Sequence, residues 1–159
     1  LRPTGLVHAE VAWVAHCVPG TEGFALRDEL PTPYEYDYFV WEGVEPDLHP
    51  YGACFHDLHD KLSTGVIEYL NAQGIRHVIV GGLALDYCVK TTVLQLFKAG
   101  FEVILHLPAC RGISEEGGVA AVDHLAQVGV MISRSRGELA AMVVGAVELS
   151  RGCEGSAAV

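Results

Sequence analysis

Apolar positions along the chain gather in short continuous runs, and the segments between these runs have helical spacing. The runs "HVIVGG" (77–82), "FEVILHL" (101–107) and "VMIS" (130–133) have the length and composition of strands that are buried on both faces. Residues 86–99 and 114–127 carry a helical pattern, the first stopped by a glycine and the second opened by a serine. This alternation predicts βαβ units, a parallel sheet and helices on both faces, which is a three-layer α/β/α fold.

The flanking segments carry weaker signals. Residues 36–43, "YDYFVWEG", are rich in aromatic side chains and predict a strand. A helix is predicted between a Ser63 or Thr64 cap and Gly74, and a last helix over residues 138–149. Residues 150–159 are expected to form a frayed tail, and the 159 residues together a single domain.

The amino-acid composition and net charge exclude several classes of protein and of binding partner. Half of the residues are hydrophobic and only 19% are charged, so a disordered chain is excluded. The formal net charge of −10 argues against nucleic acid and against an anionic membrane surface. No run reaches the roughly 18–20 apolar residues that a membrane span needs. Five cysteines without a C-x-x-C pair predict thiols in a cytoplasmic protein, and composition leaves a homo-oligomer open.

The residue that draws attention to chemistry is Cys88, in the first turn of a helix that follows a buried strand. Unpaired N–H groups and the helix dipole favour a thiolate there, yet packing is equally open from spacing alone. The glycine pair 81–82 lacks the G-x-G-x-x-G spacing of a nucleotide site, and Asp86 would repel a phosphate. His56 and His59 in "FHDLHD" could bind a metal, although a solvated loop is favoured.

Three stretches, in order, resemble nicotinamidases of the isochorismatase-like cysteine hydrolase superfamily. They are "WVAHCVPGTEG" (13–23), "WEGVEPDLHPYGACFHD" (41–57) and "GGLALDYCVKTTVLQLFKAGFEVILHLPACRGIS" (81–114). The resemblance covers residues 13 to about 132. It implies an isochorismatase-like hydrolase fold and a small-molecule amide substrate. The implied reaction converts nicotinamide to nicotinate and ammonia through a cysteine thioester.

The resemblance also implies roles for single residues. Cys88 matches the nucleophile, and the backbone N–H groups of Ala84 and Cys88 match the oxyanion hole. The Leu83–Ala84 bond matches a cis peptide. His16 matches one ligand of a divalent metal, which could be zinc, iron or manganese. The implied substrate contacts are Trp13, Tyr51 and Leu83.

Several positions depart from the family pattern. Glu42 stands where the family has its catalytic lysine, and a carboxylate there would raise the pKa of a neighbouring thiol. Leu85, Gly52 and Pro108 replace a threonine, a serine and an aspartate. The match begins after the family's first strand and metal loop. We therefore expect these residues to lack that strand, the catalytic aspartate and the remaining metal ligands.

These departures leave two further interpretations beside a nicotinamidase. One keeps the fold and Cys88 but changes the substrate to another small molecule, because Gly52 and Leu85 alter the pocket region. The other is a non-catalytic relative, which Glu42 favours. In each case we expect Cys17 and Cys110 to pack as buried apolar side chains.

Overall fold

The computed structural model describes residues 14–44, 48 and 50–154 of the chain. Its contacts divide into two compact units, residues 1–69 and residues 70–159, and each unit is described by itself. In the part of the chain that the structure describes, no helix combines the length and the apolar character that a membrane crossing requires. The single domain expected from the sequence stays a prediction.

The second unit is built around a three-stranded parallel sheet. Its strands are β1 (His77–Leu83), β2 (Glu102–Arg111) and β3 (Met131–Ser133), in the spatial order β1-β2-β3. β1 pairs with β2 in parallel, and β2 pairs with β3 in parallel. The three apolar runs are therefore strands of one sheet, which confirms the parallel α/β prediction.

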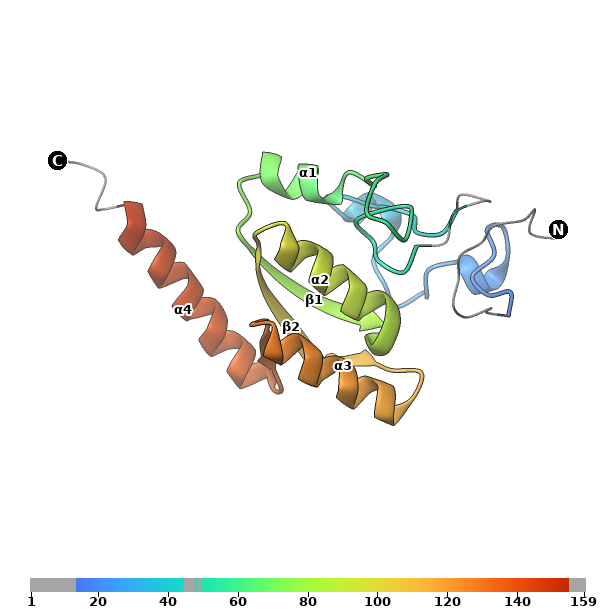
Figure 1. Cartoon of the computed structure of the whole chain (residues 1–159). Helices are drawn as coiled ribbons and strands as arrows, with labels where there is room; N and C mark the ends of the chain where they lie inside the picture. The colour runs from blue at the N-terminus through green and yellow to red at the C-terminus, as the bar shows by residue number, and fades with distance from the viewer. Residues whose placement is uncertain (1–13, 45–47, 49, 155–159) are drawn as a thin grey trace. The chain divides into compact units, whose positions relative to one another are not determined.

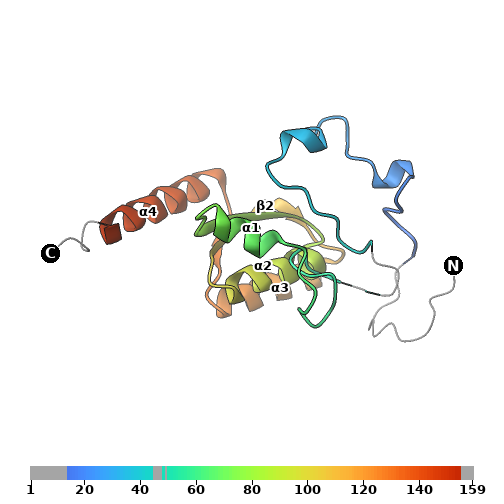
Figure 2. The same ribbon diagram turned by 90° about the horizontal axis from the view of Figure 1, so that it is seen from above.

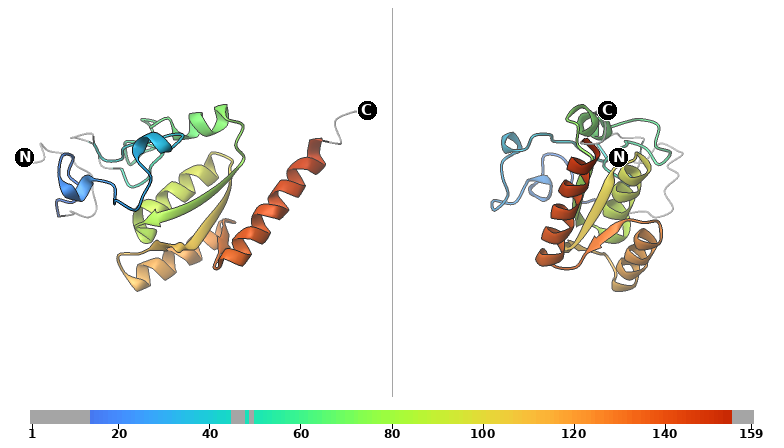
Figure 3. Two further views of the ribbon diagram at one scale, coloured as in Figure 1. Left: turned by 180° about the vertical axis from the view of Figure 1, so that it is seen from behind. Right: turned by 90° about the vertical axis from the view of Figure 1, so that its left-hand side faces the viewer.

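Helices follow each strand and cover both sides of the sheet. After β1 come a π-helical turn (Leu85–Val89) and α2 (Lys90–Lys98), and β2 is followed by α3 (Glu115–Gln127). Figures 1 and 2 show α2 and α3 beside each other on one face. The last helix, α4 (Arg136–Glu154), lies on the other side of the sheet in the right panel of Figure 3. These are the three layers that the sequence predicts.

The core of this unit lies between β2 and the two helices α2 and α3. Three successive residues in the first half of β2, residues 103–105, are buried, because a central parallel strand is covered on both faces. Facing helical residues recur at helical spacing and seal the same core. The fully or almost fully buried members are Val93, Leu96, Val103, Ile104, Leu105, Ala121 and Leu125.

A bulge interrupts the pairing of β1 with β2 near the carboxyl ends of both strands. Val80 lies opposite Leu105, but Gly82 lies opposite Cys110, so β2 carries extra residues there. Gly81 permits this path, since a Cβ on it would come within 2.9 Å of the Ala109 Cβ. Pro108 falls in the bulge, where a residue without an N–H group is tolerated.

Helix boundaries follow the signals in the sequence. The Ser114 side chain accepts a hydrogen bond from the Gly117 N–H and caps α3. α1 (Val66–Ala72) is followed by Gly74 at a φ of 68°, a left-handed conformation that suits glycine. α4 is longer than expected at both ends and runs through residues 150–154. The frayed tail predicted for those five residues is wrong, and residues 155–159 lie outside the described part.

The strand predicted over residues 36–43 does not form. These residues follow bends and irregular backbone, and two of their aromatic rings pack on other segments. The Tyr38 ring stacks on Tyr69 with centroids 4.5 Å apart, and its hydroxyl donates to the Thr64 carbonyl. Trp41 meets Phe24 edge to face at 5.0 Å. In the described residues of this first unit, no strand runs beside the segment to pair with it.

Candidate active site

Cys88 lies in the π-helical turn that leaves the carboxyl end of β1. The Leu83–Ala84 peptide bond just before the turn is cis, as the resemblance implies. The Ala84 carbonyl accepts hydrogen bonds from the N–H groups of both Tyr87 (3.1 Å) and Val89 (3.0 Å), which closes the wide turn. Cys88 is half-buried, and it lies two residues before the start of α2 rather than inside a regular α-helical turn.

The backbone at Cys88 is hydrogen-bonded on the side of α2 and exposed on the side of β1. The Thr92 hydroxyl donates a 2.8 Å hydrogen bond to the Cys88 carbonyl from the next turn of helix. Leu83 is 71% exposed and Ala84 is half-buried, so the approach to the turn from β1 is open in this unit. The structure therefore brings Leu83, Ala84 and Cys88 together at the carboxyl end of β1, where parallel sheets carry their working groups.

Asp86, inside the same turn, points into the protein. Its carboxylate accepts hydrogen bonds from the Ile113 N–H (3.0 Å) and the Ser114 N–H (3.2 Å), beyond the end of β2. Burial by itself would raise the pKa of Asp86, but the N–H groups outweigh it and hold that pKa below its ordinary value. The carboxylate thus joins the π-helical turn to the segment between β2 and α3.

The remaining expected site residues belong to the first unit or lie outside the described residues. Trp13 lies outside them. His16 is exposed, Tyr51 is half-buried in a turn, and Glu42 is half-buried in a bend. The roles that the resemblance implies for these residues stay predictions.

Glu42 acts on a thiol of its own unit, that of Cys54. Burial raises the pKa of the Cys54 thiol to about 12, and the carboxylates of Asp60, Glu68 and Glu42 add to the effect. A thiol with such a pKa is protonated at neutral pH, so Cys54 has the character of a packing residue.

The side chains expected to bind a metal are already engaged in part by other hydrogen bonds. The His16 Nδ1–H donates to the Val14 carbonyl at 2.7 Å, which leaves Nε2 as the nitrogen that could bind a metal. In "FHDLHD" the Asp57 carboxylate is occupied by the N–H groups of His59, Lys61 and Leu62. Within the described ranges, no three His, Cys, Asp or Glu side chains are grouped to hold a metal. The described donors thus do not fit a complete metal site.

The two cysteines expected to be buried differ from each other. Cys110 is 3% exposed, its thiol donates to the His106 carbonyl, and burial raises its pKa, so the prediction is confirmed for this residue. Cys17 is exposed, and the prediction is wrong for it. Its φ of 47° places it in a left-handed bend of an irregular segment, where no helix or strand among the described residues covers the side chain.

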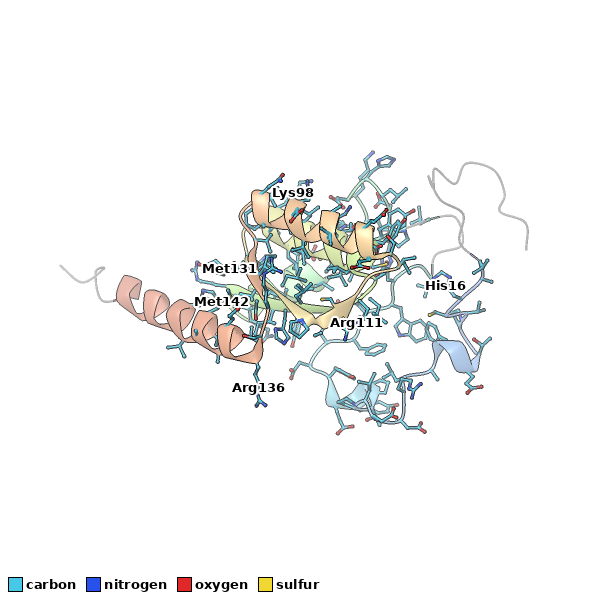
Figure 4. The ribbon with its side chains drawn as sticks, turned by 90° about the horizontal axis from the view of Figure 1, so that it is seen from below. His16, Lys98, Arg111, Met131, Arg136 and Met142 are labelled. Atoms are coloured by element: carbon cyan, nitrogen blue, oxygen red, sulfur yellow. The ribbon has the colours of Figure 1, made fainter. Side chains whose placement is uncertain are left out.

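Arg111 closes β2, at the right of the sheet in Figure 4. Its guanidinium donates to the carbonyls of Pro108 (3.3 Å) and Cys110 (2.6 Å), both on its own strand. Leu85 is 5% exposed, and its Cδ2 would lie 3.6 Å from a Cβ on Gly118 of α3. Leu85 therefore packs against the start of α3.

A scan of protein families matches residues 6–136 to the isochorismatase domain. The chain belongs to the isochorismatase family. The nicotinamidase of Acinetobacter baylyi is 32% identical over 110 residues, which cover 69% of this chain and 50% of that protein. The nicotinamidase of Escherichia coli is 35% identical over 102 residues, covering 64% and 47%. The chain thus spans about half the length of the curated relatives it matches.

Solved structures of the isochorismatase family agree with the fold. The nicotinamidase and pyrazinamidase of Acinetobacter baumanii superposes with a TM-score of 0.71 at 30% identity, covering 78% of this chain and 59% of that one. The pyrazinamidase of Pyrococcus horikoshii in complex with zinc has a TM-score of 0.67 at 30% identity, covering 78% and 64%. The expected isochorismatase-like hydrolase fold is therefore confirmed.

The residue at this site that the sequence analysis misjudged is Asp86. Its place in the first turn suggested only a charge that would repel phosphate. The partners of its carboxylate lie 27 and 28 residues further along the chain, where no local pattern signals them. The weak signal was a pair of glycines, 117 and 118, at the start of α3, an uncommon choice inside a helix.

Proposed function

We propose that the chain forms the nucleophile-bearing part of a nicotinamidase-type amide hydrolase, which converts nicotinamide to nicotinate and ammonia. The observation that carries the proposal is the position of Cys88, in a π-helical turn at the carboxyl end of β1, in a chain of the isochorismatase family. Nicotinamidases among its relatives support the substrate.

In this reaction the Cys88 Sγ, as a thiolate, attacks the amide carbonyl carbon. The negative charge that develops on the carbonyl oxygen is stabilised by the N–H groups of Ala84 and Cys88. The C–N bond then breaks, and the leaving nitrogen takes up the proton that the Cys88 thiol released on forming the thiolate, and departs as ammonia. Water attacks the resulting thioester, nicotinate is released, and the Cys88 thiol is restored.

Glu42 decides how active the chain itself is. A carboxylate in the place of the family lysine removes a cation from the thiolate and adds an anion, and both changes raise the thiol's pKa. We expect the parent chain to release ammonia from nicotinamide slowly. In a chain that also carries the family's catalytic aspartate, Glu42→Lys should raise the rate over its parent by about tenfold or more, since one pKa unit corresponds to about 1.4 kcal/mol. Glu42→Gln, which only removes the negative charge, should fall between the two.

The assay measures ammonia from purified proteins, with Cys88→Ser as the baseline. Equal rates in the parent and in Glu42→Lys would show that Glu42 is not beside the thiol. Rates at the Cys88→Ser baseline in all variants would instead favour the non-catalytic relative, the interpretation that Glu42 supports. Hydrolysis of a different small amide by the parent would favour the changed substrate, for which the buried Leu85 gives no support.

A divalent metal and a cytoplasmic location belong to the same proposal. The zinc-bound pyrazinamidase among the structural neighbours supports a metal, for which His16 would supply one ligand. The reduced thiols of Cys17, Cys54, Cys88 and Cys110 support a reducing compartment.

A further inference from the structure

Backbone N–H groups from a distant segment bind the Asp86 carboxylate. It is 8% exposed, and its two oxygens accept the N–H groups of Ile113 and Ser114, the last two residues before α3. Hydrogen bonds from N–H groups to a buried carboxylate are charge-assisted and directional. The π-helical turn is thereby attached to a segment that is distant in sequence.

Two glycines leave space for the Asp86 carboxylate at this position. A Cβ on Gly117 would lie 2.6 Å from Asp86 Oδ2, and a Cβ on Gly112 would lie 3.5 Å from Asp86 Oδ1. The Gly112 Cβ would also lie 2.9 Å from the Ser114 carbonyl oxygen. Any side chain at Gly117 would therefore displace the Asp86 carboxylate from its present position.

The same turn carries the nucleophile. Asp86 and Cys88 are two residues apart in a segment of five, and the Ala84 carbonyl binds the N–H groups on either side of Cys88. A fixed Asp86 carboxylate therefore fixes the path of the backbone from Ala84 to Cys88. That path sets the direction of the thiol and of the two N–H groups assigned to the oxyanion hole.

We propose that Asp86 is a positioning residue of the amide hydrolysis, acting through the turn that holds Cys88 and not on the substrate. The inference rests on the proposed function. A misplacement of about 1 Å in reacting groups costs on the order of 100-fold in rate. We therefore expect Asp86→Asn, made in the Glu42→Lys chain, to lower kcat by about tenfold or more while KM changes by less than about twofold.

Alkylation of Cys88 gives a second readout that does not depend on turnover. Iodoacetamide modification of Cys88, followed by mass spectrometry across a pH series, yields the midpoint at which the thiolate forms. Loss of a nearby negative charge alone would lower this midpoint. Loss of the position of the thiol at the N-terminus of α2 would raise it toward about 8.5, the value of an ordinary cysteine. We expect a rise in Asp86→Asn.

Asp57→Asn is the matched control. Asp57 also uses its carboxylate to accept backbone N–H groups, those of His59, Lys61 and Leu62, but in a loop of the other unit. This variant should leave both kcat and the Cys88 midpoint unchanged. A purely stabilising role of Asp86 would give the same result in both variants while they remain folded, and that outcome would overturn the proposal.

A second variant covers the case in which Asp86→Asn does not fold. Gly117→Ala keeps the negative charge but displaces the carboxylate, and it should raise the Cys88 midpoint, whereas Gly118→Ala should not. An unchanged or lowered midpoint in Gly117→Ala overturns the positioning role. If no variant releases ammonia, the proposed function fails, and the alkylation midpoints still decide the role of Asp86.

Discussion

Gly117 and Gly118 are neighbours in the first turns of α3, yet a methyl group added to each meets a different environment. At Gly117 the new Cβ would lie 2.6 Å from Asp86 Oδ2 and 2.7 Å from Ser114 Oγ. At Gly118 the nearest atom, Leu85 Cδ2, is 3.6 Å away, which is ordinary van der Waals contact. Both substitutions add one methyl group to the same helix. A comparison of the two therefore isolates the effect of displacing the Asp86 carboxylate.

The expected changes have opposite signs. Alanine is favoured over glycine inside a helix by about 1 kcal/mol, so Gly118→Ala should raise the free energy of unfolding by about 0.4–1 kcal/mol. At Gly117 the methyl group displaces both the Ser114 cap, worth about 1 kcal/mol, and one charge-assisted hydrogen bond to Asp86, worth about 1.5–3 kcal/mol. After the same helix gain, Gly117→Ala should lower the free energy of unfolding by about 1.5–3 kcal/mol.

Urea unfolding followed by far-ultraviolet circular dichroism measures both changes. The midpoint of Gly118→Ala should lie above that of the parent, and the midpoint of Gly117→Ala below it, with similar dependence on urea in all three proteins. If both variants are stabilised equally, the carboxylate of Asp86 does not occupy the space beside Gly117, and the positioning argument loses its structural basis.

Two further predictions concern titration and thiol reactivity. Because the N–H groups of Ile113 and Ser114 hold the folded-state pKa of Asp86 below its ordinary value, its carboxylate stabilises the fold above about pH 4, and this contribution is lost as the pH falls through the folded-state pKa. Stability measured from pH 6 to pH 2.5 should therefore fall less steeply in Asp86→Asn than in the parent, and parallel curves would contradict this assignment. Iodoacetamide should modify the half-buried Cys88 faster than Cys110, whose pKa is raised by burial, and the reverse order would refute the assignment of the nucleophile.

Local signals in the sequence determined most of the second unit. The apolar runs at β1, β2 and β3 predict strands because a parallel strand that is buried on both faces carries apolar residues at successive positions. The Ser114 cap and the glycines after the helices are recognised for the same kind of reason, since each satisfies or ends a helix within a few residues. The position of Cys88 after a strand also follows from such short-range patterns.

The aromatic segment 36–43 shows where a local pattern fails. Tyrosine, phenylalanine and tryptophan suit a strand only when a second strand lies alongside to accept their backbone hydrogen bonds. Here Tyr38 and Trp41 find ring partners from separate segments, and the backbone follows those contacts. The exposure of Cys17 has the same origin, because burial depends on whether another element packs over a residue.

Only the tertiary structure decided how the turn at Cys88 is held. The bulge that brings Gly82 opposite Cys110, and the hydrogen bonds from Ile113 and Ser114 to Asp86, join residues that are 27 or 28 positions apart in the chain. Hydrophobic periodicity reports which face of an element is buried, but it carries no information on the register between two strands or on the backbone N–H groups that a distant loop presents. The sequence by itself therefore determined the strands and helices of the second unit and the place of Cys88 after β1, and the folded chain determined the hydrogen bonds that hold the turn around it.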